Sequence, residues 1–340
     1  MKELPELLQS RKLAYAELTL AAIIIGSSVV VGKMTTMQMP VFFSQAASLA
    51  VALLALVPIL VFRRDVIFKV GKKDLLLLIV QAFLGMFMFR VFMLYGLRAV
   101  PAAEAGIVTS LTPAVVVLFS FFLLKERMSR RLAIGVLCSL LGVVSIRAPE
   151  WLAAGPSTST PASYLGLLLV FGAVCGEAML IILRKMTASH VSSLVGTAYV
   201  TFFSFLMFLP FSFVELRRFD VARVDAQGWG MLLYYGLFIT LLAYVLWFRG
   251  VSKVPAGTAA VYSSYTPVST LLLSYAILRE PFSWAHVIGC GFVLLGVVQV
   301  SRNQAGSGRR EKAPRRRREG RSLTDPNDPP SVHTRSRRRV

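Results

Sequence analysis

Two ionisable side chains lie deep inside apolar stretches of the sequence, where they could bind a solute or a proton. Arg90 lies seven residues before the end of the stretch 75–97, and Glu177 lies six residues before the end of the stretch 164–183. A charge in hydrocarbon is costly, so such residues usually face a polar cavity or a partner. Arg90 therefore faces an aqueous cavity or has a structural role. Glu177 binds a proton or a substrate amine, or it pairs with a neighbouring helix.

Three further glutamates lie near the ends of apolar stretches. Glu104 follows closely after Pro101, where an acid suits the positive end of a helix whether or not it takes part in coupling. Glu126 and Glu280 each follow a basic residue. Either they form helix-end ion pairs with loop cations, or they are gate residues that pair in one state and separate in the other.

Aromatic rings with polar tips are concentrated in the stretches 229–248 and 256–278. A cavity wall of such rings would take an amphipathic or cationic organic solute through stacking and cation–π contacts. An aromatic belt at the membrane surface is the alternative for rings near a helix end. The candidate cavity residues are Tyr244, Trp247, Tyr262 and Tyr265.

Pro113 and Pro267 fall about halfway along the stretches 102–124 and 256–278. A proline removes a backbone hydrogen bond and clashes with the preceding turn, so the helix should loosen there. A threonine precedes each proline and can satisfy a freed carbonyl group, while exposed backbone suits a binding site or a hinge. A plain packing kink is the alternative.

The sequence contains no constellation typical of an enzyme or a metal site. His190, His286 and His333 are scattered, and no glycine-rich phosphate loop precedes a basic residue. The three cysteines fall in apolar runs, where they suit packing better than disulfide or metal chemistry. We therefore predict that the protein is not an enzyme and uses neither a metal nor a cofactor.

The elements that position these residues must be membrane helices. The 340-residue chain is 56% hydrophobic and only 16% charged, with a mean hydropathy of +0.66, which is more apolar than one soluble core can bury. Most of its apolar stretches have about the length that a helix needs to cross roughly 30 Å of hydrocarbon. They lie near 18–32, 40–62, 75–97, 102–124, 132–147, 164–183, 191–213, 229–248, 256–278 and 282–300. We predict an all-α integral membrane protein with ten transmembrane helices.

Residues 96–146 and 250–300 repeat the same segment at an offset of 154. About 20 of the 51 aligned residues are identical, and they include Pro, Thr, Glu and Gly, which shared hydrophobicity does not explain. Each half has five predicted spans, an odd number, so the second half should enter the membrane from the opposite side. The prediction is a pair of inverted five-helix repeats, an arrangement suited to alternating access.

The basic residues of the loops predict the orientation. In the first half, twelve lie on the side of the N-terminus and three on the other side, while the second half is balanced. The positive-inside rule therefore places both termini in the cytoplasm. The predicted segments are an N-terminal segment (1–12), the first repeat (13–148), a linker (149–163), the second repeat (164–302) and a disordered basic tail (303–340).

The sequence resembles the drug/metabolite transporter superfamily, in particular its ten-span branch with two EamA domains. The resemblance covers about residues 15–302 and rests on motifs that occur in register in both halves. In the first half these are Gly26, Lys33, Val100-Pro101-Ala102-Ala103, Pro113, Lys125-Glu126, Gly135 and Gly142-Val143-Val144. In the second half they are Lys185, Tyr244, Trp247, the run from Pro255 to Ala260, Pro267, Glu280-Pro281, Gly289 and Gly296-Val297-Val298. The resemblance implies transport of small molecules across the cytoplasmic membrane, commonly export.

We therefore expect a secondary transporter that exports a small amino acid-like, amphipathic or cationic organic metabolite, by facilitated diffusion or by proton exchange. An importer is one alternative, and a membrane scaffold that recruits partners through its tail is another. From Arg302 onward the chain carries 13 basic and 4 acidic residues, which suits binding to anionic lipid better than to nucleic acid. Glycines such as Gly289 and Gly296 allow close helix packing within the bundle or in a homodimer.

Overall fold

The computed structural model describes residues 3–63, 70–123, 161–187, 191–253 and 265–296 without 293, together with 134, 137, 138, 141 and 262. Every regular element in this part of the chain is a helix. Seven helices there are long and apolar enough to cross a membrane, and a shorter apolar helix covers Trp284–Gly296. The seven cover Leu13–Gln38, Val41–Val61, Lys72–Ala99, Ala102–Leu123, Pro161–Arg184, Leu194–Leu216 and Ala226–Trp247. The all-α membrane class is confirmed, whereas the predicted fifth span lies almost entirely outside the described residues.

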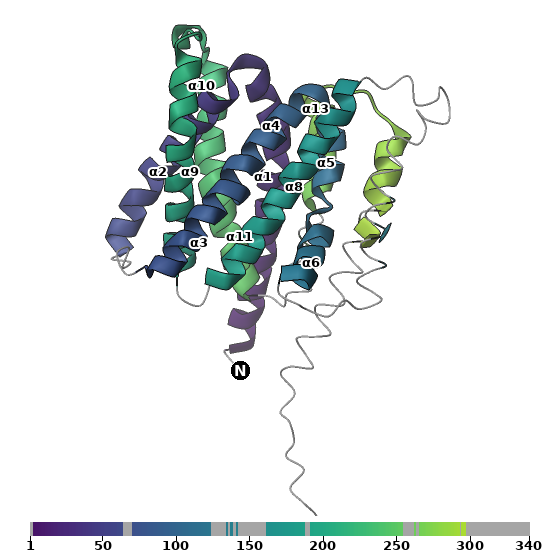
Figure 1. Cartoon of the computed structure of the whole chain (residues 1–340). Helices are drawn as coiled ribbons and strands as arrows, with labels where there is room; N and C mark the ends of the chain where they lie inside the picture. The colour runs from purple at the N-terminus through teal and green to yellow at the C-terminus, as the bar shows by residue number, and fades with distance from the viewer. Residues whose placement is uncertain are drawn as a thin grey trace, which may run out of the picture.

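The helices lie side by side in a bundle, with the N-terminus at its lower end (Figure 1). The first half contributes α1 (Glu3–Gln38), α2 (Val41–Arg63), α3 (Lys72–Ala82), α4 (Phe89–Ala99), α5 (Ala102–Thr109) and α6 (Thr112–Leu123). The second half contributes α8 (Pro161–Thr187), α9 (Ser193–Leu216), α10 (Ala226–Tyr234), α11 (Ala243–Lys253) and α13 (Tyr265–Ile277). The first helix is longer than the apolar stretch 18–32 predicted, because its ends carry polar residues that hydropathy alone excludes.

Two of the spans change helix type in the middle. A π-helix, η1 (Phe83–Met88), joins α3 to α4, and a second π-helix, η3 (Tyr235–Leu242), joins α10 to α11. Adding the repeat offset of 154 to the bounds of η1 gives 237–242, which falls within η3. The same irregularity therefore occurs at equivalent places in the two halves.

The fourth predicted span is interrupted beside its proline. The first piece, α5, ends at Thr109, and α6 begins at Thr112, so that Pro113 lies in the first turn of α6. Proline suits this position because its missing N–H would have no partner there. The Thr112 hydroxyl donates to the carbonyl oxygen of Thr109 at 2.7 Å, so a side chain satisfies the carbonyl at the break.

Helices of the two halves contact one another in matching pairs. Adding 154 to the bounds of α4 gives 243 and 253, which are the bounds of α11, and α1 and α8 both contain Lys-Met-Thr near their ends. In space α4 packs against α8, and α1 packs against α11. Since α11 is the equivalent of α4 and α1 is the equivalent of α8, the same pair of helices is in contact twice in the bundle.

Gly96 of α4 and Gly166 of α8 let these helices approach closely. A Cβ atom on Gly96 would lie 2.7 Å from Val170 Cγ2 and 2.9 Å from the carbonyl oxygen of Gly166. We expect Gly96→Ala to lower the melting temperature, because overpacking a tight contact costs roughly 1–3 kcal/mol. Gly230→Ala is the control, since nothing lies within 4 Å of a Cβ there and alanine favours helix. Equal thermal stability of the two variants would contradict the close approach.

Candidate functional site: a central polar cluster

Arg90 lies in a buried polar cluster to which both halves contribute. The residue is only 4% exposed, and its Nη1 donates to Gln45 Oε1 at 2.7 Å while its Nη2 donates to Thr240 Oγ1 at 2.9 Å. The guanidinium carbon lies 5.1 Å from the centre of the Tyr235 ring, a cation–π contact. Among the described residues no carboxylate forms an ion pair with Arg90. The cluster therefore holds a positive charge among neutral partners.

The π-helices bring these groups together. Arg90 follows η1 by two residues, and η3 supplies both Tyr235 and Thr240. The Thr240 hydroxyl donates to the carbonyl oxygen of Tyr235 at 2.9 Å, so it satisfies a group within the irregular turn while it accepts a hydrogen bond from Arg90. π-Helices are rare and are often found at functional sites.

Glu177 of α8 reaches the break in the fourth span. Its Oε2 lies 2.7 Å from Thr112 Oγ1, the same oxygen that is 2.7 Å from the carbonyl oxygen of Thr109. A hydroxyl has a single proton to donate, and a carbonyl group has none. Both short contacts are hydrogen bonds at once when Glu177 carries its proton and donates it to Thr112, while Thr112 donates to Thr109.

Tyr244 interacts electrostatically with Arg90, Glu177 and Tyr235. Adding 154 to 90 gives 244, so Arg90 and Tyr244 occupy equivalent positions in the two halves. Trp247 lies almost one turn further along α11 and is half-buried. We call the set Gln45, Arg90, Glu177, Tyr235, Thr240 and Tyr244 the central polar cluster.

Glu280 lies at the end of the bundle where α1 and α4 end and α2 and α5 begin. We call this end of the bundle the Lys33 end. The two carboxylate oxygens of Glu280 accept from the backbone N–H groups of Ala102 and Ala103, at 2.6 and 3.0 Å. Lys33 Nζ lies 3.5 Å from Glu280 Oε1 and donates to the carbonyl oxygen of Val100 at 2.7 Å. An acid of the second half thus caps a helix of the first half.

Glu280→Ala is expected to destabilise the protein by about 1–2 kcal/mol, because the variant loses a helix N-terminal cap and a charge at the positive end of α5. Lys33→Met removes the ion pair with Glu280 and the hydrogen bond to the carbonyl oxygen of Val100 but leaves the cap of α5 in place, so it should cost less. Glu280→Gln retains one acceptor and should fall between the two. Thermal unfolding of the purified variants tests this order, and a Glu280→Ala protein as stable as the wild type would contradict the capping role.

Tyr262 and Tyr265 form a separate aromatic contact with α1. Tyr262 stacks on Tyr15, with ring centres 5.6 Å apart, and lies at the same distance from Tyr265, which is 45% exposed. These rings contact the beginning of α1 and not Arg90. Glu104 is buried in the first turn of α5, as its position after Pro101 suggested, and Pro267 is buried near the start of α13. Glu126 lies outside the described residues.

Sequence reasoning missed the neutral members of the cluster. Gln45, Tyr235 and Thr240 were not selected, because only charged residues, prolines and dense aromatic positions were weighed. A signal for Gln45 was present: an amide in the apolar stretch 40–62 is costly to bury without partners. Within the described part of the chain no group of three or more His, Cys, Asp or Glu residues could hold a metal ion.

Comparison with known proteins relates this chain to a family of membrane transporters. The sequence pattern of the EamA-like transporter family matches residues 13–148 and 164–302. The chain is 39% identical over 284 residues to the uncharacterized transporter YetK of Bacillus subtilis, which covers 84% of this chain and 85% of YetK. It is 25% identical over 232 residues to protein PecM of Dickeya dadantii, covering 66% of this chain and 72% of PecM.

A solved structure has the same fold. A crystal structure of another protein superimposes on this chain with a TM-score of 0.61 at 20% sequence identity. The superposition covers 87% of this chain and 98% of the other. At this identity the similarity concerns the arrangement of the helices. It carries no information about the solute.

Proposed function

Because the chain belongs to the EamA-like transporter family, we propose that it exports a small metabolite across the cytoplasmic membrane by alternating access of two inverted repeats. Membership makes it a multi-pass membrane protein related to transporters of small solutes. The direction, the mechanism and the solute class are our proposal. The observation that carries it is the central polar cluster, in which the equivalent residues Arg90 and Tyr244 interact electrostatically.

The paired structure of the two halves supports inverted repeats. Equivalent π-helices, η1 and η3, lie beside the cluster, and the contact of α4 with α8 is matched by the contact of α1 with α11. Such halves can exchange conformations and open a central site first to one side and then to the other. Glu280 and Lys33 hold the Lys33 end together in this conformation. By the repeat, Glu126 and Lys185 would act at the opposite end.

The cluster favours an amino acid-like solute. The charge of Arg90 attracts a carboxylate, which can replace its neutral partners Gln45 and Thr240. Glu177 can accept a solute amine once it has lost its proton, and Tyr244 offers a ring between the two. A cationic organic solute would use Glu177 and the rings alone. The same residues would serve import, with the gradient reversed.

Glu177 supports proton exchange as the energy source. Its contact with Thr112 can form in both protonation states, since the hydroxyl donates to a charged carboxylate or accepts from a protonated one, while a solute amine favours the charged form. Solute and proton would then compete for one side chain. A proton that enters as the solute leaves would drive export.

Transport by purified protein in liposomes tests the proposal directly. Labelled amino acids, amines and organic cations are supplied on one side, and counterflow against the same internal solute is measured. Saturable counterflow of at least one solute is expected, while liposomes without protein give none. If the ten-helix region cut after Arg302 moves nothing but the full chain recruits a soluble partner, the scaffold alternative gains the support instead.

The inverted arrangement has its own test. In a variant without the three native cysteines, a cysteine at Ser157 in the linker should react with a membrane-impermeant thiol reagent in intact cells. A cysteine at Ser10 should react only after the membrane is opened. Labelling of both positions from the same side would contradict five spans per half.

Two finer parts of the proposal concern the surroundings of the protein. The tail after Arg302, outside the described residues, would lie on anionic lipid at the cytoplasmic face, at about 1 kcal/mol per basic residue near the surface. A homodimer is compatible with the small residues of the predicted tenth span, and both termini would be cytoplasmic. Flotation with phosphatidylserine vesicles, compared with neutral vesicles, tests the lipid contact.

A further inference from the structure

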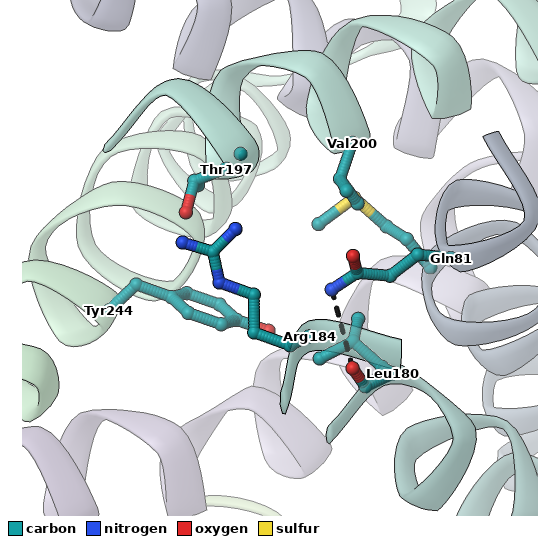
Figure 2. A pocket seen from close by; sticks show the side chains of 8 residues that line it. Gln81, Leu180, Arg184, Thr197, Val200 and Tyr244 are labelled. Carbon is teal, nitrogen blue, oxygen red and sulfur yellow. Dashed lines mark hydrogen bonds between the residues drawn. The ribbon is translucent and has the colours of Figure 1, made fainter. Parts of the chain in front are cut away.

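A small cavity lies toward the end of the bundle opposite Glu280, where α8 and α11 end and α9 begins. We call this end of the bundle the Arg184 end. Gln81, Arg184, Thr197 and Tyr244 are among its lining residues (Figure 2). Its volume of about 30 Å³ has room for a group the size of one or two waters, not for a whole metabolite. Tyr244 also belongs to the central polar cluster, so the cavity borders the proposed transport site.

Two polar groups in this cavity have no hydrogen-bond partner among the residues that the structure describes. Arg184 Nη1 is buried and unpaired, and so is Oε1 of Gln81, a residue that is only 3% exposed. The Gln81 side-chain nitrogen is occupied, since it donates to the carbonyl oxygen of Leu180 at 3.3 Å. In Figure 2 the carboxamide of Gln81 lies to the right, and the guanidinium of Arg184 lies to the left, beside Thr197. The same cavity is therefore lined by one residue with an unpaired donor, Arg184 Nη1, and one with an unpaired acceptor, Gln81 Oε1.

The guanidinium fits because of a glycine in α9. A Cβ atom on Gly196 would overlap Arg184 Nη1, whereas the hydrogen of glycine leaves room for it. Arg90, by comparison, uses Nη1 and Nη2 for Gln45 and Thr240. Of these two arginines, Arg184 is the one that has a donor ready for a ligand.

We propose that Arg184 and Gln81 form a recognition site for the carboxylate head group of the solute, before the solute reaches the central polar cluster. A carboxylate oxygen accepts from Arg184 Nη1, and an amine or hydroxyl group next to the carboxylate donates to Gln81 Oε1. The apolar remainder of the solute packs against neighbours such as Met86 and Val200 as the cavity widens. The site rests on the proposed transport function and narrows its solute class to α-amino or α-hydroxy acids.

Binding to the full-length protein in detergent tests the site separately from transport. The probes are L-leucine, L-leucinamide, in which an uncharged carboxamide replaces the carboxylate, and 4-methylpentanoate, which lacks the amine. The wild type is expected to bind L-leucine most tightly, 4-methylpentanoate more weakly, and L-leucinamide roughly 10-fold or more weakly than L-leucine, because a charge-assisted hydrogen bond is lost.

Three variants locate the effect. Arg184→Gln should weaken L-leucine binding roughly 10-fold or more and leave L-leucinamide unchanged. Gly196→Ala should do the same with Arg184 still present, because the methyl group displaces the guanidinium. Arg218→Gln, on the exposed loop after α9, is the control and should bind like the wild type. Thermal unfolding of each variant shows that it is folded.

Two results would overturn the site and would mean that the cavity holds water only. The first is equal binding of L-leucine and L-leucinamide by the wild type. The second is unchanged L-leucine binding by both Arg184→Gln and Gly196→Ala. Counterflow of an amine that carries no carboxylate, together with no binding of L-leucine, would also overturn it but leave the transport function intact. Failure of every solute in the liposome assay, with carboxylate binding retained, would instead count against transport.

Discussion

Arg90→Met is expected to reduce transport roughly 100-fold while the protein remains folded, because the variant loses the one charge at the centre of the polar cluster. The guanidinium is almost fully buried and has neutral partners, so it draws little stability from ion pairing. Methionine fills a similar volume without the cost of burying a charge. Activity and stability should therefore respond differently to this substitution.

Most of the partners of Arg90 keep a hydrogen bond in the variant. Thr240 still donates to the carbonyl oxygen of Tyr235. Ser48, whose hydroxyl accepts from Arg90 Nη1 at 3.5 Å, still donates to the carbonyl oxygen of Gln45. Only Gln45 Oε1 is newly unpaired, and Gln45 Nε2 has no partner even in the wild type. The double variant Arg90→Met with Gln45→Leu should therefore be at least as stable as Arg90→Met alone.

Counterflow in liposomes and thermal unfolding are the two measurements. Arg218→Met, which changes an exposed arginine, is the control and should transport at the wild-type rate. A variant that loses most of its stability together with its transport would mean that Arg90 is a structural residue. A variant that transports normally would remove Arg90 from the site altogether.

Glu177→Gln is expected to abolish uphill transport driven by a pH gradient but to preserve counterflow. A glutamine side chain can donate to Thr112 Oγ1 as a protonated glutamate does, so the contact with the break between α5 and α6 is kept. The amide cannot release a proton in this pH range, so binding of the solute is no longer linked to release of a proton.

The direction of the pH effect follows from the same reasoning. In the proposed mechanism Glu177 loses its proton to bind a solute amine, so a rise in pH on the side of solute entry should favour loading. Protonation on the acidic side should favour release. The rate of wild-type export should therefore increase as the outside becomes more acidic, and that of Glu177→Gln should not change.

Glu104→Gln provides the comparison, since Glu104, like Glu177, is an acid within a predicted span, but it is buried in the first turn of α5, where the helix dipole stabilises its charge. Its pH dependence should resemble that of the wild type. If only Glu104→Gln loses the pH dependence, the coupling site is Glu104. If neither variant loses it, transport is facilitated diffusion.

The sequence by itself determined that the chain belongs in a lipid bilayer, that it is all-helical and that residues 96–146 are repeated at 250–300. Lipid offers no hydrogen bonds to the backbone, so each apolar stretch long enough to span it must be a helix. The break beside Pro113 was also predictable, because proline cannot continue the hydrogen bonds of the preceding turn.

Only the tertiary structure decided which polar groups meet. A membrane helix is apolar on the side that faces lipid and largely apolar on the side that faces its neighbours, so the sequence does not show how the helix is rotated. Arg90 bonds to residues 45 and 150 positions away, and Glu280 caps a helix that begins 178 positions before it. The unpaired groups of Gln81 and Arg184 have meaning only because packing brings them to one cavity.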